Sequence, residues 1–469
     1  MLLSIWLLSS CVCIKIVGGV FLSTFNSGEI EKLSAERYGD VPSHLYSFSF
    51  ERRATWSRHF PKQPEILDYL EHCVEAHHLE RHLELGCEIT AANWDDRDGQ
   101  WTLHTKSGDV RTFDHVVFGL GQLNRPRWPD LAGLDSFAGT VFHSARWNHD
   151  HDLTGERVAV IGNGASAVQF VPRIARKVSH LDQYQRAPNW LLPKPDDRFS
   201  PAQIRRFQRI PALQRLHRSR IYATFETRFA ALIQGSRASR LAQVLSTKYI
   251  TSQVPDPELR AKLIPDYPVG CKRILISNDY LRALGKEHVE VVTDPITHVE
   301  SDAIVTADGT RRPVDTIIVA TGFEATDFLA PITVTGRDGR VLAEDWREGA
   351  AAYQGIVVPG YPNLYLLYGP NTNLGHNSII FMIESQIRWI LAAMAHTRAQ
   401  RARWVEVRDE AAARYDDAIR KALGKTVWEA GCDSWYKNEA GKVTNNWPDY
   451  TFRYWRETRR LRAEDLRTG

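Results

Sequence analysis

A glycine-rich stretch, RVAVIGNGASAVQF, carries the clearest chemistry in the sequence. Gly162, Gly164 and Ala167 form a GxGxxA pattern between a strand-forming run and a helix-compatible run. In such a turn the first glycine permits a tight bend and the second lets the backbone approach a pyrophosphate. The third small residue lets the helix pack on the strand, and the helix N-terminus holds the phosphates. We therefore predict a dinucleotide site between a strand at 156–161 and a helix at 165–177.

The strand that should reach the adenosine ribose is HLDQYQR. It ends in Gln185 and Arg186, where an NAD-binding unit usually places Asp or Glu. An arginine at that point can pair with a 2′-phosphate, so the sequence favours NADP over NAD. The alternative is an ordinary surface arginine. Ser166, at the start of the expected helix, completes the set of cofactor-binding residues in this unit.

Two segments, one before and one after the glycine turn, share one sequence pattern. Residues 88–121 and 289–322 each alternate apolar and polar residues between glycine turns and then close with an apolar run and a glycine. Each segment predicts a three-stranded meander that leads into a buried strand. Asp114 and Asp315 precede the two apolar runs. The duplication indicates two similar α/β domains, although only the second copy follows a glycine fingerprint.

Composition sets limits on partners and compartment. The 469 residues are 43% hydrophobic and 25% charged, which is enough for two or three domains with their own cores. A net charge of +3 implies no strong attraction to polyanions, and we expect no nucleic-acid partner. The six cysteines are scattered and show neither a disulfide framework nor a zinc spacing. We therefore expect no metal, no disulfide and a cytoplasmic location.

The N-terminus is apolar over residues 1–25, interrupted by Lys15 and small polar residues. This length is sufficient for a membrane anchor or a signal sequence. A buried strand or helix is a second interpretation. A third is that this start is not the natural one of the fold.

Just ahead of the glycine turn stands FAGTVFHSARW, in which Phe137, Gly139, His143 and Trp147 form the pattern FxGxxxHxxxW. Here the chain resembles the class B flavin monooxygenases, and specifically the Baeyer–Villiger monooxygenases. Asn148 follows the tryptophan where that group has Pro or Asp, which is a small departure. Without the resemblance, His143 and Trp147 could simply pack in the connection between domains.

Further segments match the same family in order from about residue 40 to about residue 459, and they are DVPSHLYSFSF, VGCKRILISNDY, IIVATGF, YGPNTNLGHNSIIFMIESQ and SWY. The resemblance assigns an active-site aspartate to Asp40 and a catalytic arginine to Arg273. It places Lys272 near the NADP phosphate. It also places Asn371 and Asn377 in the segment that passes under the flavin ring, where a polar turn capping the following helix is the structural alternative.

The activity that this resemblance implies is FAD- and NADPH-dependent insertion of one oxygen atom of O2 into a ketone, giving an ester or a lactone. The reaction needs a negatively charged oxygen nucleophile, and an anion needs nearby positive charge. Arg273 could supply that charge permanently, and Asp40 could orient it. Heteroatom oxidation and a catalytically silent NADP-binding protein are the alternatives. The substrate and the oligomeric state stay open.

The implied fold is α/β, a flavoprotein with two dinucleotide-binding domains. Residues 1–39 contain no GxGxxG pattern, so we expect the first FAD-binding unit to be truncated or replaced by this apolar stretch, and FAD to be held poorly. We expect a partial FAD domain at 40–149, an NADP domain at 150–320 and a return to the FAD domain at 321–469. A helical, arginine-rich insertion at about 200–263 is either a solvated surface or a wall of the substrate mouth.

Overall fold

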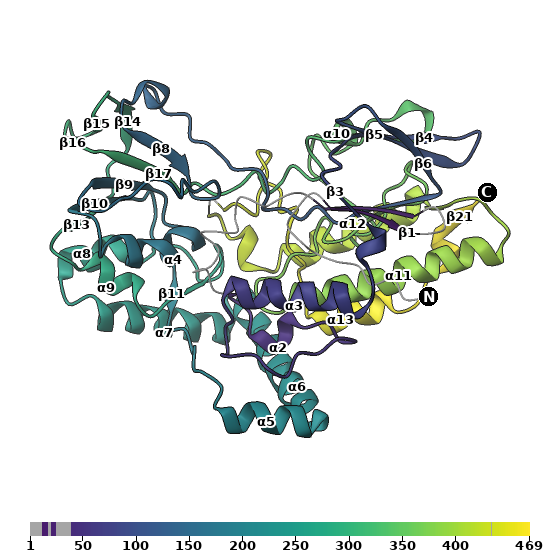
Figure 1. Cartoon of the computed structure of the whole chain (residues 1–469), viewed down its shortest axis with the longest axis horizontal. Coiled ribbons are helices and arrows are strands. Elements are labelled where there is room, and N and C mark those ends of the chain that lie inside the picture. Colours follow the sequence, from purple (N-terminus) through teal and green to yellow (C-terminus); the bar gives the residue numbers. More distant parts are fainter. Residues whose placement is uncertain (1–11, 17–19, 25–38, 433) are drawn as a thin grey trace.

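The computed structural model describes residues 12–16, 20–24, 39–432 and 434–469. Two five-stranded sheets lie in opposite halves of Figure 1, and most of the helices lie between and below them. A smaller, mainly antiparallel sheet lies above each of them in Figure 1. The arrangement is the two-unit α/β architecture that the duplicated segments predict.

The sheet at the left of Figure 1 follows the glycine turn. Its order is β13 (Val289–Val292), β10 (His180–Tyr184), β9 (Arg157–Ile161), β17 (Thr316–Val319) and β8 (Thr140–His143). All four strand pairs are parallel. The central strands β9 and β17 are almost wholly apolar and buried, as a parallel sheet covered on both faces requires. This sheet includes β8, which lies before residue 150 in the chain.

The other sheet begins with the apolar N-terminus. Its order is β19 (Leu364–Leu366), β7 (His115–Phe118), β2 (Val20–Thr24), β1 (Val12–Ile16) and β3 (Leu83–Leu85). Strand β7 is parallel to β2 and β19, whereas β1 is antiparallel to both β2 and β3. Residues 12–16 and 20–24 therefore form strands of a sheet, as the second interpretation of the apolar N-terminus expects. The rest of that stretch lies outside the described residues.

Both predicted meanders are present. The first consists of β4 (Ile89–Asp95), β5 (Gln100–Thr105) and β6 (Val110–Phe113), with β18 (Thr333–Thr335) added beside β4. The second consists of β14 (Ile296–Val299), β15 (Ala303–Thr306) and β16 (Arg311–Pro313). The glycines that close the two buried strands, Gly121 and Gly322, both have positive φ values, of 70° and 91°. They turn the chain where a side chain would be strained.

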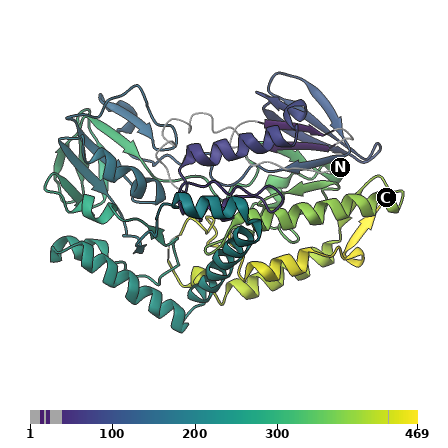
Figure 2. The same cartoon turned by 60° about the horizontal axis from the view of Figure 1, so that its bottom comes forward.

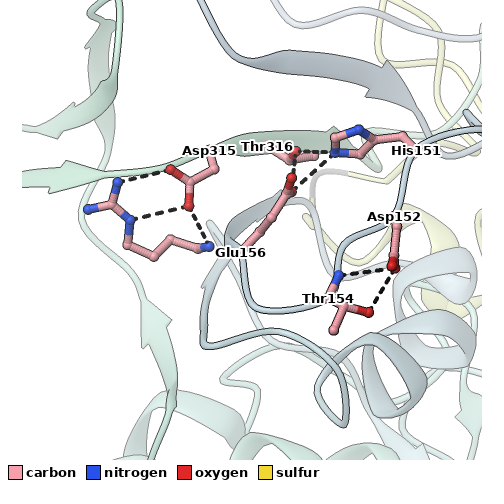
Figure 3. Close-up of polar contacts among 7 residues, drawn as sticks. His151, Asp152, Thr154, Glu156, Asp315 and Thr316 are labelled. Carbon is pink, nitrogen blue, oxygen red and sulfur yellow. Dashed lines mark hydrogen bonds and ion pairs between the residues drawn. The ribbon is translucent and has the colours of Figure 1, made fainter.

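Polar contacts fix the start of the strand that leads to the glycine turn (Figure 3). Asp315, placed before β17, accepts hydrogen bonds from the backbone N–H of Arg157 at 2.8 Å and from its guanidinium at 2.9 Å. Thr316 donates to Glu156 at 2.7 Å, and His151 contacts both residues. The aspartate singled out in the sequence thus anchors β17 to β9 at the end opposite the turn.

The insertion is helical, as predicted, and its first two helices project at the bottom of Figure 1, which comes forward in Figure 2. It comprises α5 (Pro201–Arg209), α6 (Pro211–Thr227), the short helix η4 (Arg228–Leu232), α7 (Arg237–Gln253) and α8 (Pro257–Leu263). Ser200 and Gln203 form a capping box at the start of α5. Helix α6 donates from Gln214 and Arg218 to backbone oxygens of residues 44–53, which ties the insertion to the first domain.

The remaining elements complete the two domains and the connections between them. They are α2 (Ser43–Tyr46), α3 (Gln63–Ala76), α4 (Ala165–Ile174), α9 (Tyr280–Leu284), α10 (Leu342–Asp345), α11 (Ile379–Ala399), α12 (Asp409–Leu423), α13 (Thr451–Thr458) and the strand pairs β11 (Leu191–Leu192) with β12 (Leu275–Ile276) and β20 (Val405–Val407) with β21 (Leu466–Thr468). Within the described residues, α11 alone is long and apolar enough to cross a membrane. Its buried Trp389 and Ile390 belong to the largest core of the first domain, which is how a core helix passes that test.

One expectation about the cysteines is wrong. Cys271 and Cys432 form a disulfide although 161 positions separate them in the sequence. No local spacing could reveal this pair, because the fold alone brings the two Cα atoms to 6.3 Å. Scattered cysteines therefore give no argument for a reducing compartment.

Candidate active site

The glycine turn has the geometry of a phosphate-binding unit. Gly162 follows β9 with a φ of 107°, and a Cβ there would lie 2.4 Å from the carbonyl oxygen of Ala320, so only glycine fits. Gly164 is the N-cap of α4, and a Cβ there would meet nothing within 4 Å. Ala167 is fully buried, and Ser166 lies half-buried in the first turn. The open side of the turn therefore faces the N-terminus of α4. The helix itself ends at Ile174, earlier than predicted.

The adenosine end of this unit carries cations. Gln185 is buried and bonded to Asn163 at 2.8 Å, so it is not directed to a ligand. Arg186 is exposed, and in the described part of the chain its guanidinium has no hydrogen-bond or ion-pair partner. Lys272 places its ammonium 4.9 Å from the ring centroid of Tyr267, whose hydroxyl donates to the carbonyl of Pro188. Lys272 thus lies beside the loop that follows Arg186.

Asp40 and Arg273 form an ion pair across the interface between the two domains. Asp40 precedes α2, and Arg273 lies just before β12. The carboxylate of Asp40, acting against burial, holds the pKa of Arg273 above its usual value. Three tyrosines surround the pair, the buried Tyr436 and the partly buried Tyr46 and Tyr368, and burial raises the pKa of Tyr436 to about 12. The guanidinium stays charged while the tyrosines stay neutral.

The ion pair lines a cavity of about 640 Å³. The first turns of α4, the strand pair β11 and β12, the η4 segment and residues 374–377 form its walls. This volume is typical of small-molecule sites. The glycine-turn helix and the Asp40–Arg273 pair therefore open into one space, although the sequence places them far apart.

Lys194 is a cavity residue that sequence reasoning missed. Its ammonium lies 5.0 Å from the ring centroid of Phe60, and burial lowers its pKa to about 8 despite the nearby Asp196 and Asp40. The segment LLPKPDD around it matches no pattern that marks a functional lysine. Only the folding of β11 against β12 brings it to the cavity.

The asparagines in the segment before α11 make two different kinds of contact. Asn377 lines the cavity and donates to the carboxylate of Glu226 at 2.7 Å. Asn371 instead donates to the carbonyls of Val443 and Asn446 at 3.2 Å, which ties this segment to the C-terminal loop. Asn377 also accepts a hydrogen bond from the backbone N–H of Ser378, the N-cap of α11, at 2.8 Å, so a polar turn leads into the helix, although the side chain of Ser378 forms no cap hydrogen bond.

The fingerprint residues lie around β8. Phe137 is buried in the core of the second domain, and a Cβ on Gly139 would lie 2.3 Å from the carbonyl oxygen of Asp315. His143, at the end of β8, is buried between the rings of Trp128 and Phe323. Trp147 packs edge-on against Phe142 and Phe170, the latter from α4. These four residues hold the connection between the domains and do not line the cavity.

Comparison with known proteins identifies this arrangement. A model of the flavin-binding monooxygenase-like family matches residues 54–341. A Baeyer–Villiger monooxygenase of Pseudomonas aeruginosa is 45% identical over 426 residues, which cover 90% of this chain and 81% of that protein. One of Streptomyces coelicolor is 40% identical, with coverage of 90% and 82%.

Solved structures agree with these relatives. A steroid monooxygenase bound to NADP has a TM-score of 0.83 at 28% identity, covering 95% of this chain and 92% of that one. A closed cyclohexanone monooxygenase has a TM-score of 0.84 at 26% identity, with the same coverage. The fold and the resemblance read from the sequence are both confirmed. The chain therefore belongs to the flavin-binding monooxygenase-like family and, within it, to the Baeyer–Villiger monooxygenases.

Proposed function

We propose that this chain uses NADPH, FAD and O2 to insert one oxygen atom into a ketone, giving an ester or a lactone. The observation that carries the proposal is the Asp40–Arg273 ion pair, which faces the same cavity as the N-terminus of the glycine-turn helix. Relatives and neighbours support it, since they include an FAD-binding monooxygenase and a steroid monooxygenase bound to NADP.

The residues fit NADP well. Gly162 and Gly164 open the turn, the first turn of α4 offers free N–H groups to a pyrophosphate, and Arg186 and Lys272 supply cations for a 2′-phosphate. The ring end of FAD fits the space bounded by Asp40, Arg273 and Asn377. Once bound, the two cofactors supply a hydride and a flavin that reacts with O2.

Arg273 has two tasks in this scheme. Its guanidinium holds negative charge on the attacking oxygen, and it then stabilises the oxyanion that forms when that oxygen adds to the carbonyl carbon. Asp40 is a positioning residue that fixes the guanidinium in the cavity. Because the pKa of Arg273 lies above its usual range, its charge does not change with pH.

The test is Arg273→Ala, assayed with excess FAD against a ketone and a thioether. We expect ester formation to fall by about 100- to 1,000-fold, as on loss of an oxyanion donor. NADPH consumption should continue, because Arg273 is not needed to bind NADPH. Arg205→Ala, on the exposed face of α5, is the matched control. Unchanged ester formation by Arg273→Ala would remove this residue from the mechanism, and thioether oxidation without any ester would favour heteroatom oxidation.

We also infer that the 469-residue chain holds FAD weakly. Residues 1–39 contain no glycine fingerprint, and β1 and β2 are paired as a hairpin beside β7. A protein that binds NADPH without retaining flavin is the second candidate function, and flavin absorbance of the purified chain separates the two. A cytoplasmic location stays a prediction, tested by cell fractionation.

A further inference from the structure

The cavity has a second cationic wall, remote from the Asp40–Arg273 pair in the sequence. Arg228, the first residue of η4, lines it with its guanidinium stacked 3.6 Å from the ring centroid of Phe225. Within the described residues Arg228 has no hydrogen-bond or ion-pair partner. Arg273 is paired with Asp40, whereas Arg228 forms no ion pair in the described part of the chain. Arg228 is exposed to solvent on one side, and although desolvation by its surroundings lowers the pKa of its guanidinium, an arginine stays charged at neutral pH.

His376 lies in the same wall and lacks partners too. It is 5% exposed, and neither ring nitrogen has a hydrogen-bond partner. The nearest carboxylate oxygen, on Glu226, is 3.8 Å from Nε2, which is too long for a hydrogen bond. Burial, helped by Arg228, lowers the pKa of His376 to about 3, so the ring is neutral and offers one donor and one acceptor. A buried polar group without a partner is costly unless a ligand satisfies it.

Three neutral donors hold the carboxylate of Glu226 in place; they do not cancel its charge, but the carboxylate forms no ion pair with Arg228. It accepts hydrogen bonds from Asn377 at 2.7 Å, from the hydroxyl of Thr451 at 2.7 Å and from the backbone N–H of Phe452 at 3.1 Å. Four apolar residues, Phe225, Ala231, Leu232 and Leu374, also line the cavity. The cavity therefore presents a cation and a neutral imidazole together with apolar side chains.

We propose that Arg228 and His376 form a subsite for a carboxylate at the far end of the substrate, so that the enzyme acts on ketones with an apolar body and an anionic terminus. The proposal rests on the proposed function, because it assumes that the carbonyl end reaches Arg273. The guanidinium and the imidazole N–H would each donate to the carboxylate. A phosphate of NADPH has the same chemistry and is the competing source, since α4 lines the same cavity.

The experiment uses straight-chain methyl ketones that end in a carboxylate, each paired with its uncharged methyl ester. Binding to the NADP-loaded protein is measured by calorimetry, and conversion is measured separately with excess FAD. We expect the acids to bind about 10- to 100-fold more tightly than the esters. Arg228→Gln should abolish that preference and leave ester binding and the KM for NADPH unchanged. Arg228→Lys should retain part of the preference, and Arg237→Gln, exposed on α7, should retain all of it.

His376→Phe should reduce the preference for acids by about 3- to 10-fold, because it removes one donor and keeps the charge of Arg228. Equal binding of acids and esters by the unmodified protein would overturn the proposal. So would an Arg228→Gln variant that loses NADPH affinity and keeps the preference, since the subsite would then hold the cofactor. Acid binding that depends on Arg228, without conversion of any ketone, would keep the subsite and reject the proposed reaction.

Discussion

The two sheets place equivalent strands in equivalent positions, yet within the described residues only the second sheet has a helix that directly follows such a strand and can hold a dinucleotide. In the second domain β9 runs parallel to β17, and β10 runs parallel to β9 on its other side. In the first domain β2 runs parallel to β7 in the place of β9, but β1, in the place of β10, runs antiparallel. Parallel neighbours need a crossover, here α4, whereas antiparallel neighbours do not. The phosphate site therefore depends on strand direction as well as on strand position.

The largest effect expected from this difference concerns FAD. The 469-residue chain, purified without added flavin, should retain little FAD. Grafting a strand–glycine turn–helix–strand unit from a relative ahead of Asp40 should raise FAD affinity by about a thousand-fold. The reason is that two or more hydrogen bonds to a charged phosphate contribute about 1.5–3 kcal/mol each. Flavin absorbance measures the FAD content of each protein, and equilibrium dialysis measures its FAD affinity. Tight, stoichiometric FAD in the ungrafted chain would show that the hairpin does not impair the site.

Substitution of the two glycines of the turn tests this comparison further, because the two variants should lose different properties. Gly162→Ala forces a Cβ against the carbonyl of Ala320, so it should lower both thermal stability and NADPH affinity, the latter by about 100-fold. Gly164→Ala meets no protein atom within 4 Å and should keep its stability while NADPH affinity falls. Gly155→Ala, at a φ of 79° with open space around its Cβ, controls for backbone strain alone.

Calorimetry and thermal melts separate these outcomes. If Gly164→Ala binds NADPH as well as the unmodified protein does, the cofactor does not approach this turn. If Gly162→Ala behaves like Gly155→Ala, close packing at the turn has no special importance.

The smallest expected effect concerns the choice between NADPH and NADH. Arg186→Ala should weaken NADPH binding by about 10-fold and leave NADH unchanged, because only NADPH carries the 2′-phosphate that the arginine can pair with. Lys272 should limit the loss, since it lies beside the same loop. The KM values of the variant and the unmodified chain for NADPH and for NADH measure this loss. Equal use of NADPH and NADH by the unmodified chain would contradict the prediction.

Several site residues illustrate how far sequence reasoning reaches. The GxGxxA turn could be predicted because its function depends on backbone conformation within a few residues, and Gly162 has the positive φ that the pattern implies. Asp40 and Arg273 were assigned only through the family resemblance, and the fold brings them into contact. Arg228, His376 and Lys194 carried no signal, because an arginine on a helix end or a histidine before a helix is usually solvated or structural.

The sequence by itself determined the local elements of this protein: the glycine turn, the two meanders, the buried strands and the helical insertion. Their signals are periodicity and turn residues, which act over a few neighbouring positions. Only the tertiary structure decided the Cys271–Cys432 disulfide, the direction of β1 and the cavity in which Arg228 and His376 face the same space. These features join residues distant in the sequence, and such contacts depend on how whole sheets and helices pack.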